Sequence, residues 1–146
     1  MSTKVWLYQT HRAVEHQEQE LLQNQMDVFA AQWQAHGKNL QAKFWFHNPY
    51  LLICEVDETI WGASGCSIDS KVRFLKDMND RYELDFFVRM KTIVKFPDGK
   101  FKQVDFADIK QLGTDIQVLN PTVVSSEQFE ALFTTINESP MKRLMI

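Results

Sequence analysis

The chain has 146 residues, of which 45% are hydrophobic and 24% charged, and its formal net charge is −3. This composition is typical of a globular protein, and it excludes a collagen-like chain, a disordered chain and a disulfide scaffold. The slightly acidic balance argues against a dedicated nucleic-acid binder. We therefore expect a single domain over residues 1–146.

The N-terminal residues and the cysteines suggest where the protein resides. The first residues contain no apolar signal region, and no run of apolar residues is long enough to span a bilayer. The two cysteines, Cys54 and Cys66, have no spacing that suggests a disulfide. We therefore expect a cytoplasmic protein that is not inserted in a membrane.

The first half of the chain predicts one strand, then a helix, then a hairpin of two strands. Residues 5–8 are rich in β-forming side chains, and residues 16–36 read as a helix. The apolar side chains of that helix recur at spacings of four, three and four residues: Leu22, Met26, Phe29 and Trp33. Gly37 is a natural helix stop, and His36 is placed to cap the helix. Residues 43–47 and 51–56, joined by a turn at 48–50, predict a hairpin.

A glycine-containing loop precedes a second predicted helix. Residues 58–67 read as this loop, and the helix runs from near Ile68 to about Tyr82, with Ser67 as its N-cap. The apolar stripe of this helix is expected to consist of Ile68, Val72, Leu75, Met78 or Asn79, and Tyr82.

The second half of the chain contains the clearest strand pattern. Residues 86–96 alternate between two faces, and the turn residues 97–100 return the chain into a strand over 101–105. A short helix over 106–112 and an edge strand over 115–119 follow. Ser125 and Gln128 form a capping-box pattern before a final helix, which Pro140 ends, leaving residues 141–146 as a tail.

This order of elements predicts a single-domain α+β fold. We expect a mostly antiparallel sheet of about five strands with two or three packed helices, in an order like that of profilin and roadblock domains. Aromatic residues make up 12% of the chain, and many fall on both faces of the predicted strands. We therefore expect both faces of the sheet to be covered by helices, by the C-terminal part of the chain or by a second subunit of a homodimer.

The strongest candidate site is the segment from residue 61 to residue 69, because free backbone N–H groups converge where a loop enters a helix. Such a place can bind a small anionic ligand and can lower the pKa of a thiol. The candidate ligand-binding residues are Trp61, Gly62, Ser64, Gly65, Cys66, Ser67 and Asp69.

Two other interpretations of this segment stay open. One is purely structural: the glycines supply a tight turn, Ser67 caps the helix and Cys66 is a small buried side chain. The other is a thiol-dependent enzyme that uses Cys66, for which we can name no complete set of catalytic residues.

Other motifs with known chemistry are missing. No glycine is followed by the Lys-Ser or Lys-Thr of a phosphate-binding Walker A loop. The four histidines lack the spacing of a zinc site, and the acidic residues Glu55, Asp57 and Glu58 read as a solvated strand end. The lysines and Arg89 between residues 89 and 102 read as a solvated face rather than a phosphate-binding patch. We expect no metal and no cofactor.

Several short segments resemble one family of small bacterial proteins. The matching segments are Val5-Trp6 with Tyr8-Gln9, Gln32-Trp33 with Ala35-His36-Gly37, the run 62–69, and Phe86-Phe87 with Arg89-Met90. Members of this family often carry the label "ABC transporter ATPase", but the chain lacks the Walker A lysine that ATP hydrolysis needs. The resemblance therefore implies a bacterial cytoplasmic protein of unknown function and not an ATPase. From the residues themselves, we expect a small binding domain for an anion or a protein partner.

Overall fold

A computed structural model describes residues 3–140 and residue 142. The α+β class is confirmed, and every strand pair is antiparallel. The strands and α-helices in chain order are β1 (Thr3–Gln9), α1 (His16–Gln32), β2 (Gln34–Ala35), β3 (Lys38–Asn39), β4 (Gln41–Asn48), β5 (Leu51–Asp57), α2 (Gly65–Tyr82), β6 (Lys91–Lys95), β7 (Phe101–Asp105), β8 (Gln117–Leu119) and β9 (Phe133–Thr135). The described residues also form the 3-10 helices η1 (Phe106–Leu112), η2 (Ser126–Ala131) and η3 (Ile136–Glu138).

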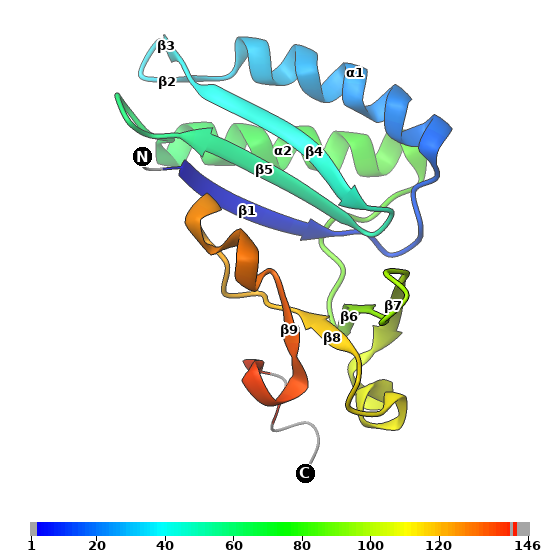
Figure 1. Cartoon of the computed structure of the whole chain (residues 1–146). Helices are drawn as coiled ribbons and strands as arrows, with labels where there is room; N and C mark the ends of the chain where they lie inside the picture. The colour runs from blue at the N-terminus through cyan, green and yellow to red at the C-terminus, as the bar shows by residue number, and fades with distance from the viewer. Residues whose placement is uncertain (1–2, 141, 143–146) are drawn as a thin grey trace.

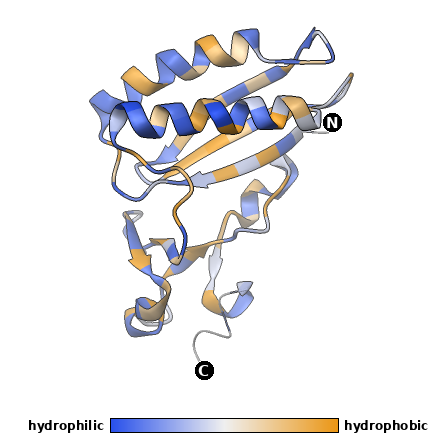
Figure 2. Ribbon diagram, turned by 180° about the vertical axis from the view of Figure 1, so that it is seen from behind, coloured by the Kyte–Doolittle hydropathy of each residue, from blue (hydrophilic) through white to orange (hydrophobic). Residues whose placement is uncertain are grey.

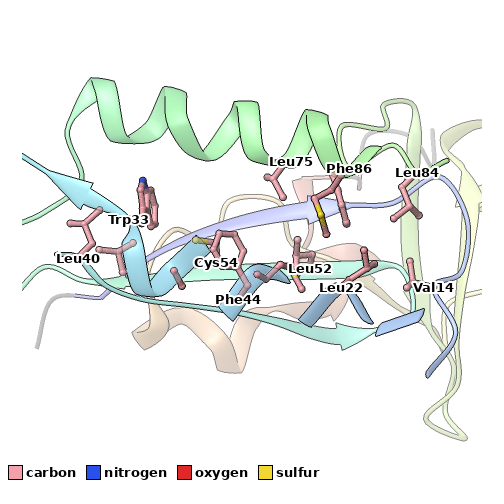
Figure 3. Close-up of a cluster of buried hydrophobic side chains, with 14 of the residues drawn as sticks. Val14, Leu22, Trp33, Leu40, Phe44, Leu52, Cys54, Leu75, Leu84 and Phe86 are labelled. Carbon is pink, nitrogen blue, oxygen red and sulfur yellow. The ribbon is translucent and has the colours of Figure 1, made fainter. Parts of the chain in front are cut away.

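One sheet has the strand order β1-β5-β4, and both α-helices pack on the same face of it (Figure 1). Its central strand β5 is buried over Leu51–Val56, because it is covered on both faces. The helix-covered side holds a large hydrophobic cluster that includes Leu22, Phe44, Leu52 and Leu75 (Figure 3). Seen from behind, α2 is a mostly hydrophilic helix lying across more hydrophobic strands (Figure 2).

The second half of the chain covers the opposite face of this sheet. Val5, Leu51 and Ile53 point to that side and pack with Ile93 and Leu119 from the C-terminal half. The aromatic side chains of Trp45 and Phe129 meet there at a centroid distance of 6.0 Å. The chain itself therefore covers both faces, as expected for a sheet with large rings on each side. The homodimer stays a prediction that this packing does not require.

Four strands of the second half of the chain form another sheet, with the order β7-β6-β8-β9. The strands of the described residues are thus divided between sheets of two (β2-β3), three and four strands instead of forming one sheet of about five. Strand β8 lies inside this sheet, between β6 and β9, and is not the edge strand that was expected. Val94 and Val118 are buried with Ile109 and Ile136 on its far side.

The predicted strand over 86–96 is wrong for its first half, since only Lys91–Lys95 is extended and paired. Met90 has a φ of 66°, which lies outside the β region and interrupts an extended strand. Phe86 turns toward the helices and is buried there, and its N–H donates to Asn79 Oδ1 at 3.0 Å. Residues 86–90 therefore form a bent connection between α2 and β6. The predicted turn at 97–100 is confirmed, with Gly99 at a φ of 86°.

The first helix is shorter than expected, and this moves His36. Helix α1 ends at Gln32, and Trp33 already has extended backbone angles. His36 and Gly37, with φ values of 52° and 77°, form the turn between β2 and β3. Two consecutive residues with positive φ are characteristic of the tightest hairpin turns. Thus Gly37 is not a helix stop, and His36 does not cap α1.

The predicted C-terminal helix is also wrong. The capping box of Ser125 and Gln128 is present, but it starts the short helix η2, and residues 133–135 then pair with β8 as strand β9. Thr134 and Thr135 favour an extended chain because they are β-branched. The predicted tail, residues 141–146, lies outside the described residues except for Lys142. Within residues 3–140 and 142, no helix combines the length and apolar composition needed to cross a bilayer.

Candidate functional site

Helix α2 begins three residues earlier than Ile68, the start expected from the sequence. Ser64, not Ser67, is the N-cap, and its hydroxyl accepts a hydrogen bond from Ser67 N at 3.2 Å. The Ser67 hydroxyl in turn accepts from Ser64 N at 2.7 Å. This reciprocal pair is a capping box that uses serine at both ends. The first amides of the helix, those of Gly65 and Cys66, have no acceptor within it, as at any helix start.

The two glycines of this segment have different roles. A Cβ atom at Gly62 would collide with the carboxylate of Glu58, which accepts a hydrogen bond from Ala63 N at 3.1 Å. Glycine at position 62 therefore lets Glu58 hold the loop. A Cβ atom at Gly65 would meet nothing, so this glycine is not required by space. Neither residue has the positive φ expected of a turn glycine.

A cavity of about 390 Å³ lies between the end of α1 and the start of α2. Ser64, Cys66 and Ser67 of the predicted site line it. The remaining lining residues come from Ser70 of α2 and from the chain around the end of α1: Phe29, Gln32, Trp33, Gln34 and His36. None of these described lining residues is acidic.

The remaining candidates do not reach this cavity. Trp61 is 36% exposed and its Nε1 donates to Asn39 O at 3.0 Å. It lines a separate cavity of about 240 Å³ beside Ile60 and Asp57. Asp69 is exposed in the second turn of α2 and lines neither cavity. The structure thus brings together three of the seven predicted residues.

The two cysteines lie in opposite environments, and neither forms a disulfide. Cys66 is exposed on the first turn of α2, so it is not the small buried side chain of the structural interpretation. Cys54 lies in β5 beneath the helices, and burial raises the pKa of its thiol to about 12. Only Cys66 is accessible to solvent at a helix start.

Lys71 is the residue that the sequence analysis missed. It is 0% exposed, and among the described residues its Nζ has no hydrogen-bond partner. The ammonium lies 3.4 Å from the centroid of the Trp6 ring, and the rings of Tyr8 and Trp33 lie at 5.4 and 5.9 Å. Burial lowers the pKa of Lys71 to about 8. This amine is enclosed by three aromatic rings instead of an acidic partner.

The predicted apolar stripe of α2 implied that Lys71 lies on the solvent face. In the structure, Ser67 and Lys71 occupy the buried face where Ile68 and Val72 were expected, together with Leu75 and Met78. The inner face of the first half of α2 is therefore rotated by one residue from the prediction. Trp33 explains the rotation, since its Nε1 donates to the backbone oxygen of Ser67 at 2.8 Å. Trp33 therefore both lines the cavity and lies near the enclosed amine of Lys71.

The acidic residues before the loop are each engaged by a local donor. Trp45 Nε1 donates to Glu55 at 2.6 Å, and Thr59 N donates to Asp57 at 2.9 Å. The hydrogen bond from the Thr59 hydroxyl, together with this backbone contact, lowers the pKa of Asp57. Within the part of the chain that the structure describes, no three His, Cys, Asp or Glu residues gather as metal ligands.

No protein family, no curated protein and no solved structure matches this chain.

Proposed function

We propose that this chain is a binding domain that holds a small anion in the cavity between the end of α1 and the start of α2. The observation that supports the proposal is the composition of that cavity wall. One side is a helix start bearing hydroxyls and a thiol, and the other is built from aromatic rings and an imidazole.

The helix side of the cavity suits a negative charge. The amide of Cys66, a lining residue, is free of an intrahelical acceptor, and the partial positive charge of a helix start adds to its attraction for an anion. The hydroxyl of Ser70 lines the same wall and can donate a further hydrogen bond. No acidic side chain among the described lining residues opposes this charge.

The opposite side suits a flat apolar group. The rings of Phe29 and Trp33 lie 5.5 Å apart, and both line the cavity. Trp33 cannot donate to the ligand because its Nε1 is already bound to Ser67 O. Its contribution is therefore ring surface. We infer a ligand with an anionic group and a planar part, in the size range of small-molecule sites.

Phenyl phosphate tests this proposal, because it joins a dianion to one ring. Cys66→Phe would fill the cavity, while Asp80→Phe adds the same side chain at an exposed position of α2 far from it. We expect calorimetric titration to show binding that Cys66→Phe weakens at least tenfold and Asp80→Phe leaves unchanged. Equal affinities for the two variants would reject this cavity as the site.

The second candidate function is thiol-dependent catalysis at the same cavity. The observation in its favour is that the exposed thiol of Cys66 and the imidazole of His36 both line it, since a nucleophilic thiol needs a neighbouring base. Iodoacetamide should then alkylate Cys66 faster than free cysteine, and His36→Ala should remove the difference. Cys54, buried in the same molecule, serves as the unreactive control. A rate equal to that of free cysteine would eliminate catalysis by Cys66.

A further inference from the structure

A second cavity, of about 550 Å³, lies where the two halves of the chain meet. It is bordered by the end of β1, by the bent connection 86–90 and by the start of β6. The connection descends from α2 past the end of β1 to reach β6 (Figure 1). This cavity shares no lining residue with the cavity at the start of α2. Ligand sites of enzymes and binding proteins are frequent at such junctions.

The connection that forms one wall is fixed at both ends. The N–H of Phe87 donates to Asp85 Oδ1 at 2.8 Å, and the ring of Phe87 meets Tyr8 edge to face at 5.8 Å. At the other end, Phe106 N donates to the carbonyl oxygen of Met90 at 3.1 Å. Met90 keeps its positive φ although its side chain is 70% exposed. These contacts keep the connection bent over the cavity.

The interior surface is largely apolar. Leu7 and Leu51 contribute from the first sheet, Phe87 from the connection, and Phe106 and Leu119 from the C-terminal half. Such a wall favours an apolar ligand body, because burial of apolar surface is the main source of binding free energy.

Several polar groups at this cavity lack a hydrogen-bonding or charged partner. Gln9 Nε2 donates to Lys91 O at 2.8 Å, whereas Gln9 Oε1 is buried and accepts no hydrogen bond from the described residues. Arg89 makes no ion pair or hydrogen bond with any described residue, and Lys91 Nζ approaches Asp105 only to 4.0 Å. None of the described residues that line the cavity is acidic. The cavity thus offers positive charge and one acceptor that lacks a donor.

We propose that this cavity binds a small carboxylic acid with an apolar body and one N–H or O–H donor. The carboxylate pairs with the guanidinium of Arg89, which can form two parallel hydrogen bonds to it. The apolar body lies against Leu7 and Phe87. Gln9 Oε1 is covered in the free protein, so the Gln9 side chain turns toward the ligand to accept from its donor. The charge of Lys91 adds to the attraction for the carboxylate.

Indole-3-acetate is the probe, because it has an apolar ring, a carboxylate and a single N–H. Two analogues each remove one feature: indole lacks the carboxylate, and 1-methylindole-3-acetate lacks the donor. We expect calorimetric titration to show saturable binding of indole-3-acetate and at least tenfold weaker binding of each analogue.

The protein variants locate the site. Arg89→Gln should weaken indole-3-acetate binding at least tenfold, and Arg73→Gln, which removes an exposed arginine of α2 outside both cavities, should not. The proposal is overturned if the protein shows no saturable binding at millimolar probe, if indole binds equally well, or if the two arginine variants have equal effects. Equal binding of 1-methylindole-3-acetate refutes the role given to Gln9. Binding that Cys66→Phe abolishes and Arg89→Gln leaves intact assigns the probe to the other cavity and also overturns the proposal.

Discussion

Replacement of Lys71 by methionine should stabilise the protein, because the enclosed amine costs free energy at neutral pH. The pKa of Lys71 falls from 10.5 to about 8 on folding. Each pKa unit corresponds to about 1.4 kcal/mol, so the shift corresponds to about 3 kcal/mol. Between these two pKa values the unfolded chain binds more protons than the folded one, and stability rises with pH. The full cost is present below pH 8 and vanishes near pH 10.5.

Lys71→Met keeps a side chain of similar length against the rings of Trp6, Tyr8 and Trp33, and it removes the charge. We expect its free energy of unfolding in urea to exceed that of the unmodified protein by about 3 kcal/mol at pH 7, and the difference to shrink toward pH 10.5. Burial also raises the pKa values of Cys54 and Tyr8. The charge of Lys71 partly offsets this for Cys54, so Lys71→Met raises the Cys54 pKa further. Both groups therefore stay neutral in either folded protein up to pH 10.5, and their effects cancel in the difference.

The control for this prediction is Lys76→Met, which removes an exposed lysine from the same helix and should leave the pH dependence unchanged. The reasoning is refuted if Lys71→Met is the less stable protein at pH 7 and the difference does not change up to pH 10.5. In that case the attraction between the ammonium and the Trp6 ring exceeds the cost of burial.

Three further predictions concern the ends of the helices. Ser64→Ala should lower the free energy of unfolding by about 1 kcal/mol through loss of the α2 cap, and an unchanged value would remove Ser64 from that role. Glu83 has a φ of 54° at the end of α2, so Glu83→Gly should raise the free energy of unfolding by about 1 kcal/mol, whereas Asp80→Gly within the helix should lower it by a similar amount. Arg12 holds Glu18 at 2.8 Å and lowers its pKa, so the stabilisation is present above the unfolded pKa of about 4.3 and is lost as the pH falls through the folded value. An acid titration of stability should be flatter for Arg12→Ala, and identical profiles would contradict the pairing.

The sequence predicts those parts of the fold that short-range rules determine. The turns at 48–50 and 97–100 were found because Asn48 and Gly99 have the side chain or backbone freedom that such turns use. Strand β1 and the body of α1 follow from β propensity and apolar periodicity.

The errors arise where tertiary contacts outweigh local pattern. Residues 86–90 follow the alternating pattern of a strand. In the structure, however, Phe86 is buried in the hydrophobic cluster beneath the two helices, and Met90 has a positive φ. Ile136 continues a helical stripe after Leu132, yet the two side chains are buried in different hydrophobic clusters. Apolar periodicity in the sequence does not show whether two apolar side chains are buried in the same hydrophobic cluster or in different ones.

The candidate site was only partly accessible to prediction. The helix start at Ser64 and Cys66 could be approached from glycine and serine placement, but the cavity depends on the early end of α1, which brings His36 and Trp33 to its other side. The burial of Lys71 could not be predicted, because a periodicity argument assigns charged residues such as lysine to the solvent face.

The central claim is that the start of α2 binds an anion, and an amide NMR titration with phenyl phosphate tests it most directly. The account predicts a saturable shift of the Cys66 amide signal, with half-saturation at the phenyl phosphate concentration that half-saturates binding by calorimetry. Shifts that scatter over surface lysines, or that gather at residues 86–92 while Cys66 stays unchanged, would contradict it.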